Sequence, residues 1–89
     1  MKSYKTEILK KLCYTELVYE RINKKLNKKR SKEEIEKMII EILKETNDLQ
    51  FQKAGKNIYV TNPERNIRIT INSNTFRIMT VDDLEKPLT

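Results

Sequence analysis

The chain has 89 residues, of which 36% are charged and 37% hydrophobic, and its formal net charge is +6. A chain of this length can bury one small core, and clustered apolar residues favour a folded single domain over disorder. No apolar run approaches the roughly 18 residues of a membrane span, and the N-terminus lacks the apolar core of a signal peptide. We therefore expect a soluble, cytoplasmic protein.

The scarcity of histidine, cysteine and glycine excludes several kinds of catalytic and metal-binding site. The chain has no histidine, one cysteine and one glycine. Nucleophile pairs that need histidine, Cys/His zinc sites and glycine-rich phosphate loops are therefore absent from this sequence. We expect Cys13 to be a small buried residue rather than a reactive thiol.

Helical spacing dominates the first half of the chain. Apolar residues predict a short helix from Tyr4 to Leu12 and a second helix over about 16–27, with one bent helix as the alternative. Ser31 and Glu34 have the spacing of a capping box, and the isoleucines that follow repeat every three or four residues. This pattern predicts a helix over 32–45.

The apolar spacing changes to every second residue after position 48. It predicts strands near 49–52, 58–60, 67–71 and 76–81, separated by turns at "AGKN", "TNPER" and Asn72 to Thr75. The order predicts an α+β fold, with two or three N-terminal helices packed on one face of a C-terminal four-stranded antiparallel meander. We assign 4–45 to the helices, 49–81 to the meander and 82–89 to a flexible tail of the same domain.

The last hairpin predicts a polar face on the sheet. If Ile71 pairs with Phe76, then Ile69 faces Ile78 and Ile67 faces Thr80 on the side of the helices. The residues expected on the opposite side are Arg68, Thr70, Arg77, Met79 and Tyr59. Two neighbouring guanidiniums and a phenol can grip phosphates and stack on a base or a peptide plane. The same residue types also suit an ordinary solvated face.

Basic charge is concentrated in the first third of the chain. Residues 1–32 hold 11 Lys or Arg and 3 Glu, whereas residues 33–89 hold 8 Lys or Arg and 10 Asp or Glu. The densest run, "KKLNKKRSK", contains Lys24, Lys25, Lys28, Lys29, Arg30 and Lys32. These six cations predict either a phosphate-binding surface or a solvated helix end.

Carboxylates gather near the C-terminus in "VDDLE". Asp82, Asp83 and Glu85 carry the hard oxygen ligands that a divalent cation prefers. Adjacent carboxylates at a strand end are more often only solvated, so we expect no metal and no cofactor.

Two stretches resemble a known family. "GKNIYVTNPERNIRITINSNTFRIMTVDD" is similar to the C-terminal half of small uncharacterised bacterial proteins that read GKNWY, ITVN and IIT, and "YTELVYERINKKL" is similar to their N-terminal motif. The chain departs from that pattern where Ile58 replaces Trp and where Val81-Asp82 replaces an Ala-His pair.

A second resemblance, through the helices and the final hairpin, is to the barnase, colicin and RelE-like ribonuclease superfamily. It implies an α+β fold and RNA cleavage by Arg, Lys and Tyr. The positions that would correspond are Lys56, Tyr59, Arg68 and Arg77.

The sequence favours a binding protein over an enzyme, because it supplies charge and surfaces but no complete catalytic set. We expect a small basic protein that docks on a nucleic acid or a nucleic-acid-loaded enzyme and blocks it, as phage or mobile-element inhibitors such as anti-CRISPR proteins do. One alternative is a RelE-like ribonuclease toxin. Another is an oligomerising module, a homodimer that pairs through an edge strand.

Overall fold

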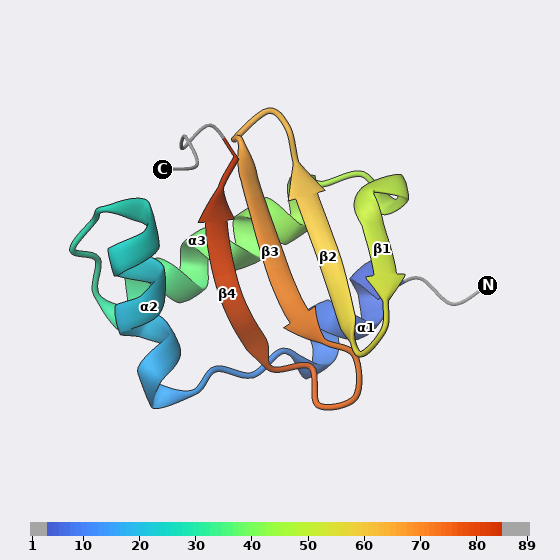
Figure 1. Cartoon of the computed structure of the whole chain (residues 1–89), viewed down its shortest axis with the longest axis horizontal. Helices are drawn as coiled ribbons and strands as arrows, with labels where there is room; N and C mark the ends of the chain where they lie inside the picture. The colour runs from blue at the N-terminus through green and yellow to red at the C-terminus, as the bar shows by residue number, and fades with distance from the viewer. Residues whose placement is uncertain (1–3, 85–89) are drawn as a thin grey trace.

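The computed structural model describes residues 4–84 and shows three α-helices followed by a four-stranded antiparallel sheet. The elements are α1 (Tyr4–Lys11), α2 (Glu16–Leu26), α3 (Lys32–Glu45), the 3-10 helix η1 (Asp48–Gln50), β1 (Phe51–Ala54), β2 (Asn57–Asn62), β3 (Ile67–Asn72) and β4 (Ile78–Asp83). Figure 1 shows the sheet in front, α3 crossing behind it, and α2 beside β4. The predicted α+β arrangement is confirmed.

The helices begin and end where local signals place them. In α3, the Ser31 side chain accepts from the N–H of Glu34, and the Glu34 carboxylate accepts from the N–H of Ser31, which completes the capping box. α2 ends at Asn27, whose left-handed backbone (φ 55°) lets its N–H donate to carbonyls of the last turn. None of the described helices is long and apolar enough to cross a membrane.

The link between α1 and α2 is extended, which excludes the single bent helix. Cys13 lies in this link, and its N–H and C=O pair with Phe76 O and Ile78 N. Because the backbone of Cys13 runs beside the start of β4, its side chain is exposed, and the prediction of a buried cysteine is wrong.

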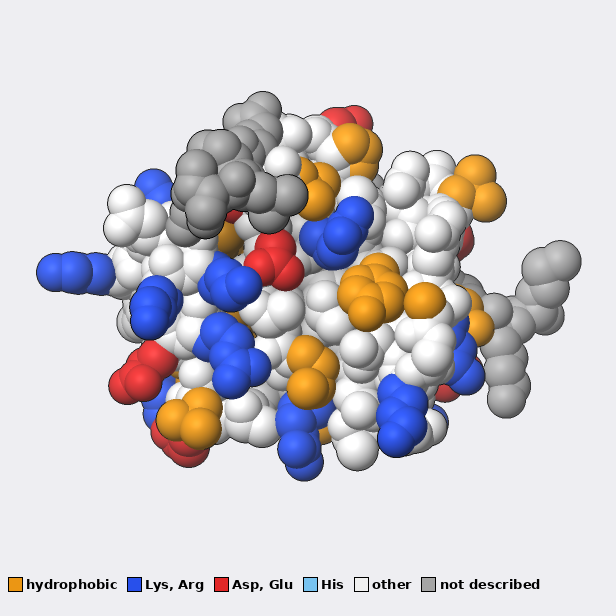
Figure 2. All heavy atoms as spheres, in the orientation of Figure 1, with side chains coloured by type: hydrophobic (Ala, Val, Ile, Leu, Met, Phe, Trp, Pro, Cys, Tyr) orange, Lys and Arg blue, Asp and Glu red, His pale blue; other side chains and the backbone are white. Residues whose placement is uncertain are grey.

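The sheet has strand order β1-β2-β3-β4, and its two faces differ. Side chains on the side of the helices form the core with the apolar faces of α1, α2 and α3. The sheet contributes Phe51, Ile58, Val60, Ile69, Ile71, Ile78 and Val81 to this core. No helix of residues 4–84 lies over the opposite face (Figure 1), which Figure 2 views directly. We call it the open face.

The register of β3 with β4 differs from the predicted one. The observed pairs are Ile71 with Ile78, Thr70 with Thr80, Ile69 with Val81, Arg68 with Asp82 and Ile67 with Asp83. The predicted pairs of Ile71 with Phe76, Ile69 with Ile78 and Ile67 with Thr80 are therefore wrong. A register shift between Thr70 and Ile71 leaves Met79 as an extra residue of β4, so Val81 rather than Thr80 enters the core.

The cause is a connection longer than the four residues expected. The Asn72 side-chain oxygen accepts from the N–H groups of Asn74 (2.8 Å) and Thr75 (3.0 Å) and organises the turn. Phe76 then takes a left-handed backbone conformation (φ 57°) while its ring packs partly against the core. Arg77 consequently precedes β4 instead of belonging to it.

Two strand boundaries also differ from the predicted ones. Leu49 lies in η1 and is 81% exposed, so it is not the inward residue of a strand that the alternation with Phe51 predicted. β4 includes Asp82 and Asp83, which the sequence assigned to the tail, and residues 85–89 lie outside the described residues.

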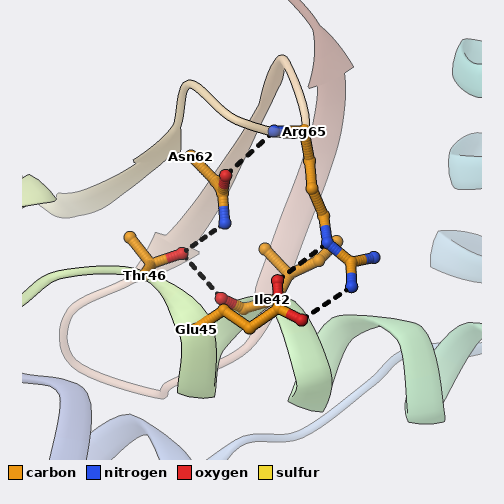
Figure 3. Close-up of polar contacts among 5 residues, drawn as sticks. All are labelled: Ile42, Glu45, Thr46, Asn62 and Arg65. Carbon is orange, nitrogen blue, oxygen red and sulfur yellow. Dashed lines mark hydrogen bonds and ion pairs between the residues drawn. The ribbon is translucent and has the colours of Figure 1, made fainter.

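A polar clamp joins the end of α3 to the turn between β2 and β3 (Figure 3). The buried amide of Asn62 donates to Thr46 Oγ1 (3.1 Å), and Thr46 donates to the carbonyl of Ile42 (2.6 Å). Asn62 Oδ1 accepts from the N–H of Arg65, whose guanidinium makes two 2.9 Å bonds to the Glu45 carboxylate. The clamp holds the sheet against α3 at this end.

Candidate functional site

Tyr59 and Arg68 lie together on the open face. Tyr59 on β2 stands opposite Gln52 on β1, and Arg68 on β3 stands opposite Thr61 on β2. Tyr59 and Thr61 are two residues apart on one strand, so these four side chains form two adjacent rows on the same face. Tyr59 and Arg68 are diagonal neighbours, whose Cα atoms are about 7–8 Å apart in such a pairing.

These rows surround a hollow of about 300 Å³. Its lining residues are Gln52, Lys53, Ala54, Tyr59, Thr61 and Arg68. Arg68 is exposed, and within residues 4–84 its guanidinium has no ion pair and no hydrogen bond. Tyr59 is half-buried, and its hydroxyl receives a long hydrogen bond of 3.5 Å from Asn57 Nδ2. The hollow therefore combines an aromatic ring with a guanidinium that no acceptor among the described residues occupies.

Arg77 is not part of this group. Its carbonyl accepts from Asn72 N (2.9 Å) and its backbone bridges to Cys13, so it lies at the end of the sheet where β3 finishes. Arg68 is four residues back along β3 from Asn72, which is about 14 Å of strand. The expectation that the two arginines lie close enough to act together, with Thr70 across from Arg77, is therefore wrong.

Lys56 lies at the same end as Arg77. It belongs to the turn between β1 and β2, and its carbonyl accepts from the N–H of Ser73 in the next hairpin turn (2.8 Å). The four positions singled out by the ribonuclease resemblance are thus spread along the sheet rather than gathered around one phosphate.

The basic run divides over several surfaces. Lys24 and Lys25 are in the last turn of α2, while Lys28 and Lys29 are exposed in the loop to α3. Arg30 is half-buried, and its N–H and C=O bond the Asn23 side chain at 3.0 Å each.

Lys32 points away from the rest of the run. It begins α3, forms an ion pair with Glu16 (2.9 Å) and lies 5.3 Å from the centroid of the Tyr19 ring. The run is therefore not one footprint, and only some of its cations can meet the same ligand.

The side of α2 that adjoins the sheet carries Arg21, Lys24 and Lys25, which we call the basic face of α2. Arg21 donates to the carbonyl of Met79 on β4 (3.0 Å), and Lys25 pairs with Asp82 on β4 (2.9 Å). Asp82 is also directly opposite Arg68, so the basic face and the open face meet at this carboxylate. Figure 2 shows Lys and Arg side chains gathered over α2 beside the open sheet.

Sequence reasoning missed Arg21, because it lies outside the dense run. Its spacing to Lys24 and Lys25 is i+3 and i+4, which places all three on one side of a helix. Together with Leu17 and Glu20 they line a depression of about 650 Å³, in which the Leu17 side chain is 70% exposed.

The acidic residues do not come together. Asp82 and Asp83 are consecutive in β4 and point to opposite faces, with Asp83 near Lys28 and Arg65 on the side of the helices. Glu85 lies outside the described residues. Within residues 4–84, no three His, Cys, Asp or Glu side chains are placed to hold a metal ion.

Comparison with known proteins gives a family. A family model described as "Protein of unknown function (DUF3781)" matches residues 6–82. No curated protein and no solved structure matches the chain. These findings agree with the resemblance to a small uncharacterised family and add no support to the ribonuclease resemblance.

Proposed function

The chain belongs to the DUF3781 family of proteins of unknown function, and we propose that it is a non-catalytic protein that binds single-stranded nucleic acid and masks the strand from other proteins. The strand lies across the open face, with a base on Tyr59, and its phosphates follow the basic face of α2. RNA and DNA share this chemistry of stacking bases and anionic phosphates.

One observation carries the proposal: the open face holds a hollow with an aromatic ring, and the basic face of α2 adjoins the open face at β4. Antiparallel sheets with one bare face offer a flat platform on which unpaired bases can stack. Here the platform holds Tyr59 and the guanidinium of Arg68, which pairs with no residue of the described range 4–84, and α2 stands beside it. Base stacking and phosphate neutralisation are thus available within one surface.

The charges on this surface favour an anionic ligand, because the cations Arg21, Lys24, Lys25 and Arg68 outnumber the carboxylates of Glu20 on α2 and Asp82 on β4. Since Asp82 sits between Lys25 and Arg68, it lowers the positive potential where the two faces meet. Removing that charge should therefore strengthen the binding of a phosphate chain.

The proposal is tested by fluorescence anisotropy with labelled single-stranded RNA, single-stranded DNA and a duplex of the same length. Tyr59→Ala should weaken binding to single strands about tenfold, because one stacked base is worth roughly 1–3 kcal/mol. Lys24→Glu should weaken it more than Lys37→Glu, which makes the same change of net charge on α3, behind the sheet. Asp82→Asn should bind more tightly than the wild type.

The Asp82→Asn variant separates a change at the binding surface from a loss of folding, because a damaged fold does not produce a gain of affinity. Absence of binding to either single strand at low salt would overturn the proposal. So would equal losses in Lys24→Glu and Lys37→Glu, because the basic face would then have no special role.

Two alternatives appear as other outcomes of the same experiments. If the protein binds no nucleic acid but captures a protein partner after nuclease treatment, the ligand of this surface would be a nucleic-acid-handling enzyme instead of a nucleic-acid strand. Shortening of the labelled RNA during the assay, lost in Arg68→Ala, would restore the ribonuclease alternative and contradict a non-catalytic role.

A further inference from the structure

The hollow beside Tyr59 contains hydrogen-bond donors that no acceptor in residues 4–84 engages. Arg68 carries five N–H donors and no acceptor, and within residues 4–84 no carboxylate or carbonyl engages its guanidinium. The carboxylate directly opposite, Asp82, is held by Lys25 at 2.9 Å. The guanidinium therefore remains available to a ligand that lies over the ring.

We infer that this hollow is a site for one guanine base, which stacks on Tyr59 and presents its O6 and N7 to Arg68. The inference rests on the proposed binding of single strands and adds to it the base that the surface selects. About 300 Å³ lies at the low end of the volumes of small-ligand pockets, which suits one base rather than a larger group.

The positions of Tyr59 and Arg68 in the two rows of side chains favour hydrogen bonds from Arg68 to the edge of a base stacked on Tyr59. A base over Tyr59 lies parallel to the ring, and Arg68 reaches it from the diagonal position on β3. Guanine offers two adjacent acceptors, O6 and N7, which match the planar fork of an arginine. Uracil and cytosine have no N7, and adenine has an amino donor where guanine has O6.

Gln52 and Thr61 complete the rim of the hollow. Gln52 stands opposite Tyr59, and Thr61 stands opposite Arg68, so both bring groups that donate and accept to the borders of the stacked base.

The experiment compares oligouridine strands that carry one central G, A, C or 7-deazaguanine, with binding followed by anisotropy. The strand with G should bind about tenfold more tightly than oligouridine, and 7-deazaguanine, which keeps the stacking surface and O6 but lacks N7, should lose most of this gain. Arg68→Ala removes the guanidinium, so binding to all strands should weaken and the preference for G over U should disappear. Lys37→Ala, on α3 behind the sheet and outside the hollow, should keep the preference for G over U.

Separate results distinguish this inference from the proposed function. If all strands bind equally in the wild type, or if A or 7-deazaguanine binds as well as G, the guanine site is wrong while single-strand binding stands. If no strand binds, both are wrong. If Arg68→Ala retains the preference for G, the assignment of Arg68 is overturned even though the protein binds the strand.

Discussion

At the scale of single residues, Tyr14 and Tyr19 form a pair whose ionisation is coupled to folding. Their rings are stacked, with centroids 5.6 Å apart and planes 12° from parallel. The Tyr19 hydroxyl donates to Glu36 Oε2 (2.7 Å), and burial together with this bond raises the pKa of Tyr19 to about 12. Burial, with the nearby charge of Glu36, also raises the pKa of Tyr14. Both phenols are therefore held in their neutral form.

This pair predicts a loss of stability in alkali. In the unfolded chain a tyrosine has a pKa near 10, below the pKa of Tyr19 in the folded protein, so the unfolded state releases its proton first. The contribution of Tyr19 is complete below pH 10 and is lost as the pH rises toward 12. Urea denaturation between pH 8 and pH 11.5 should show the free energy of unfolding falling.

A matched pair of variants shows whether Tyr19 causes this loss of stability at high pH. Tyr19→Phe should reduce the fall between pH 8 and pH 11.5, whereas Tyr4→Phe, on the exposed side of α1, should not change it. An equal fall in wild type and Tyr19→Phe would show that another group, such as Tyr14, causes the whole effect.

At the scale of elements, the sequence predicted helices and strand faces better than strand ends. The capping box at Ser31 and the period of the isoleucines are local signals, and they determine α3. The alternation through β2 places Tyr59 on the open face with Arg68 of β3. Such patterns depend on neighbours along the chain, which is why they can be read without a structure.

The last hairpin depends on contacts that have no local signal. An aromatic residue with positive φ, as at Phe76, is uncommon, and the extra residue at Met79 follows from packing β4 against α2 and the core. This is why Arg77 was placed on the open face beside Arg68. Arg21 lies outside the dense basic run, and its bond to the carbonyl of Met79, 58 residues away in the chain, has no local signal.

The clamp at the end of α3 gives a prediction at the same scale. Asn62→Ala removes the donor to Thr46 and the acceptor of the Arg65 N–H in a buried position, so it should lower the free energy of unfolding by about 2 kcal/mol. Glu45→Gln weakens only the exposed pair with Arg65 and should cost less than about 1 kcal/mol. Urea denaturation measures both, and a cost for Asn62→Ala no larger than that for Glu45→Gln would contradict the role of the clamp.

At the scale of the whole molecule, charge and architecture divide along the chain. Residues 1–32, which hold 11 of the 19 Lys and Arg, end at the start of α3. They supply α2, which stands at the β4 side of the sheet and brings its cations to the open face. The basic character of the chain is thereby presented at one flank of the proposed binding surface.

This placement predicts strong salt dependence. If four cations of the basic face and the open face contact phosphates, the logarithm of affinity should fall with the logarithm of salt concentration at a slope of about −3 for a single strand. Between 50 and 500 mM salt the affinity should drop about a thousandfold, and Lys24→Ala should make the slope less steep. Anisotropy titrations at several salt concentrations measure this slope, and affinity independent of salt would favour docking on a protein surface.

The two edge strands of the sheet, β1 and β4, differ in how far other parts of the chain cover them, and this difference limits how the protein can assemble. The β4 edge is occupied, because Cys13 pairs with its start and Arg21 bonds the carbonyl of Met79. No strand of residues 4–84 pairs with the outer edge of β1. A second copy that added its own β1 would use up both vacant edges at once. Assembly through strands would therefore stop at two chains, and a fibre built by repeated strand addition has no site from which to grow.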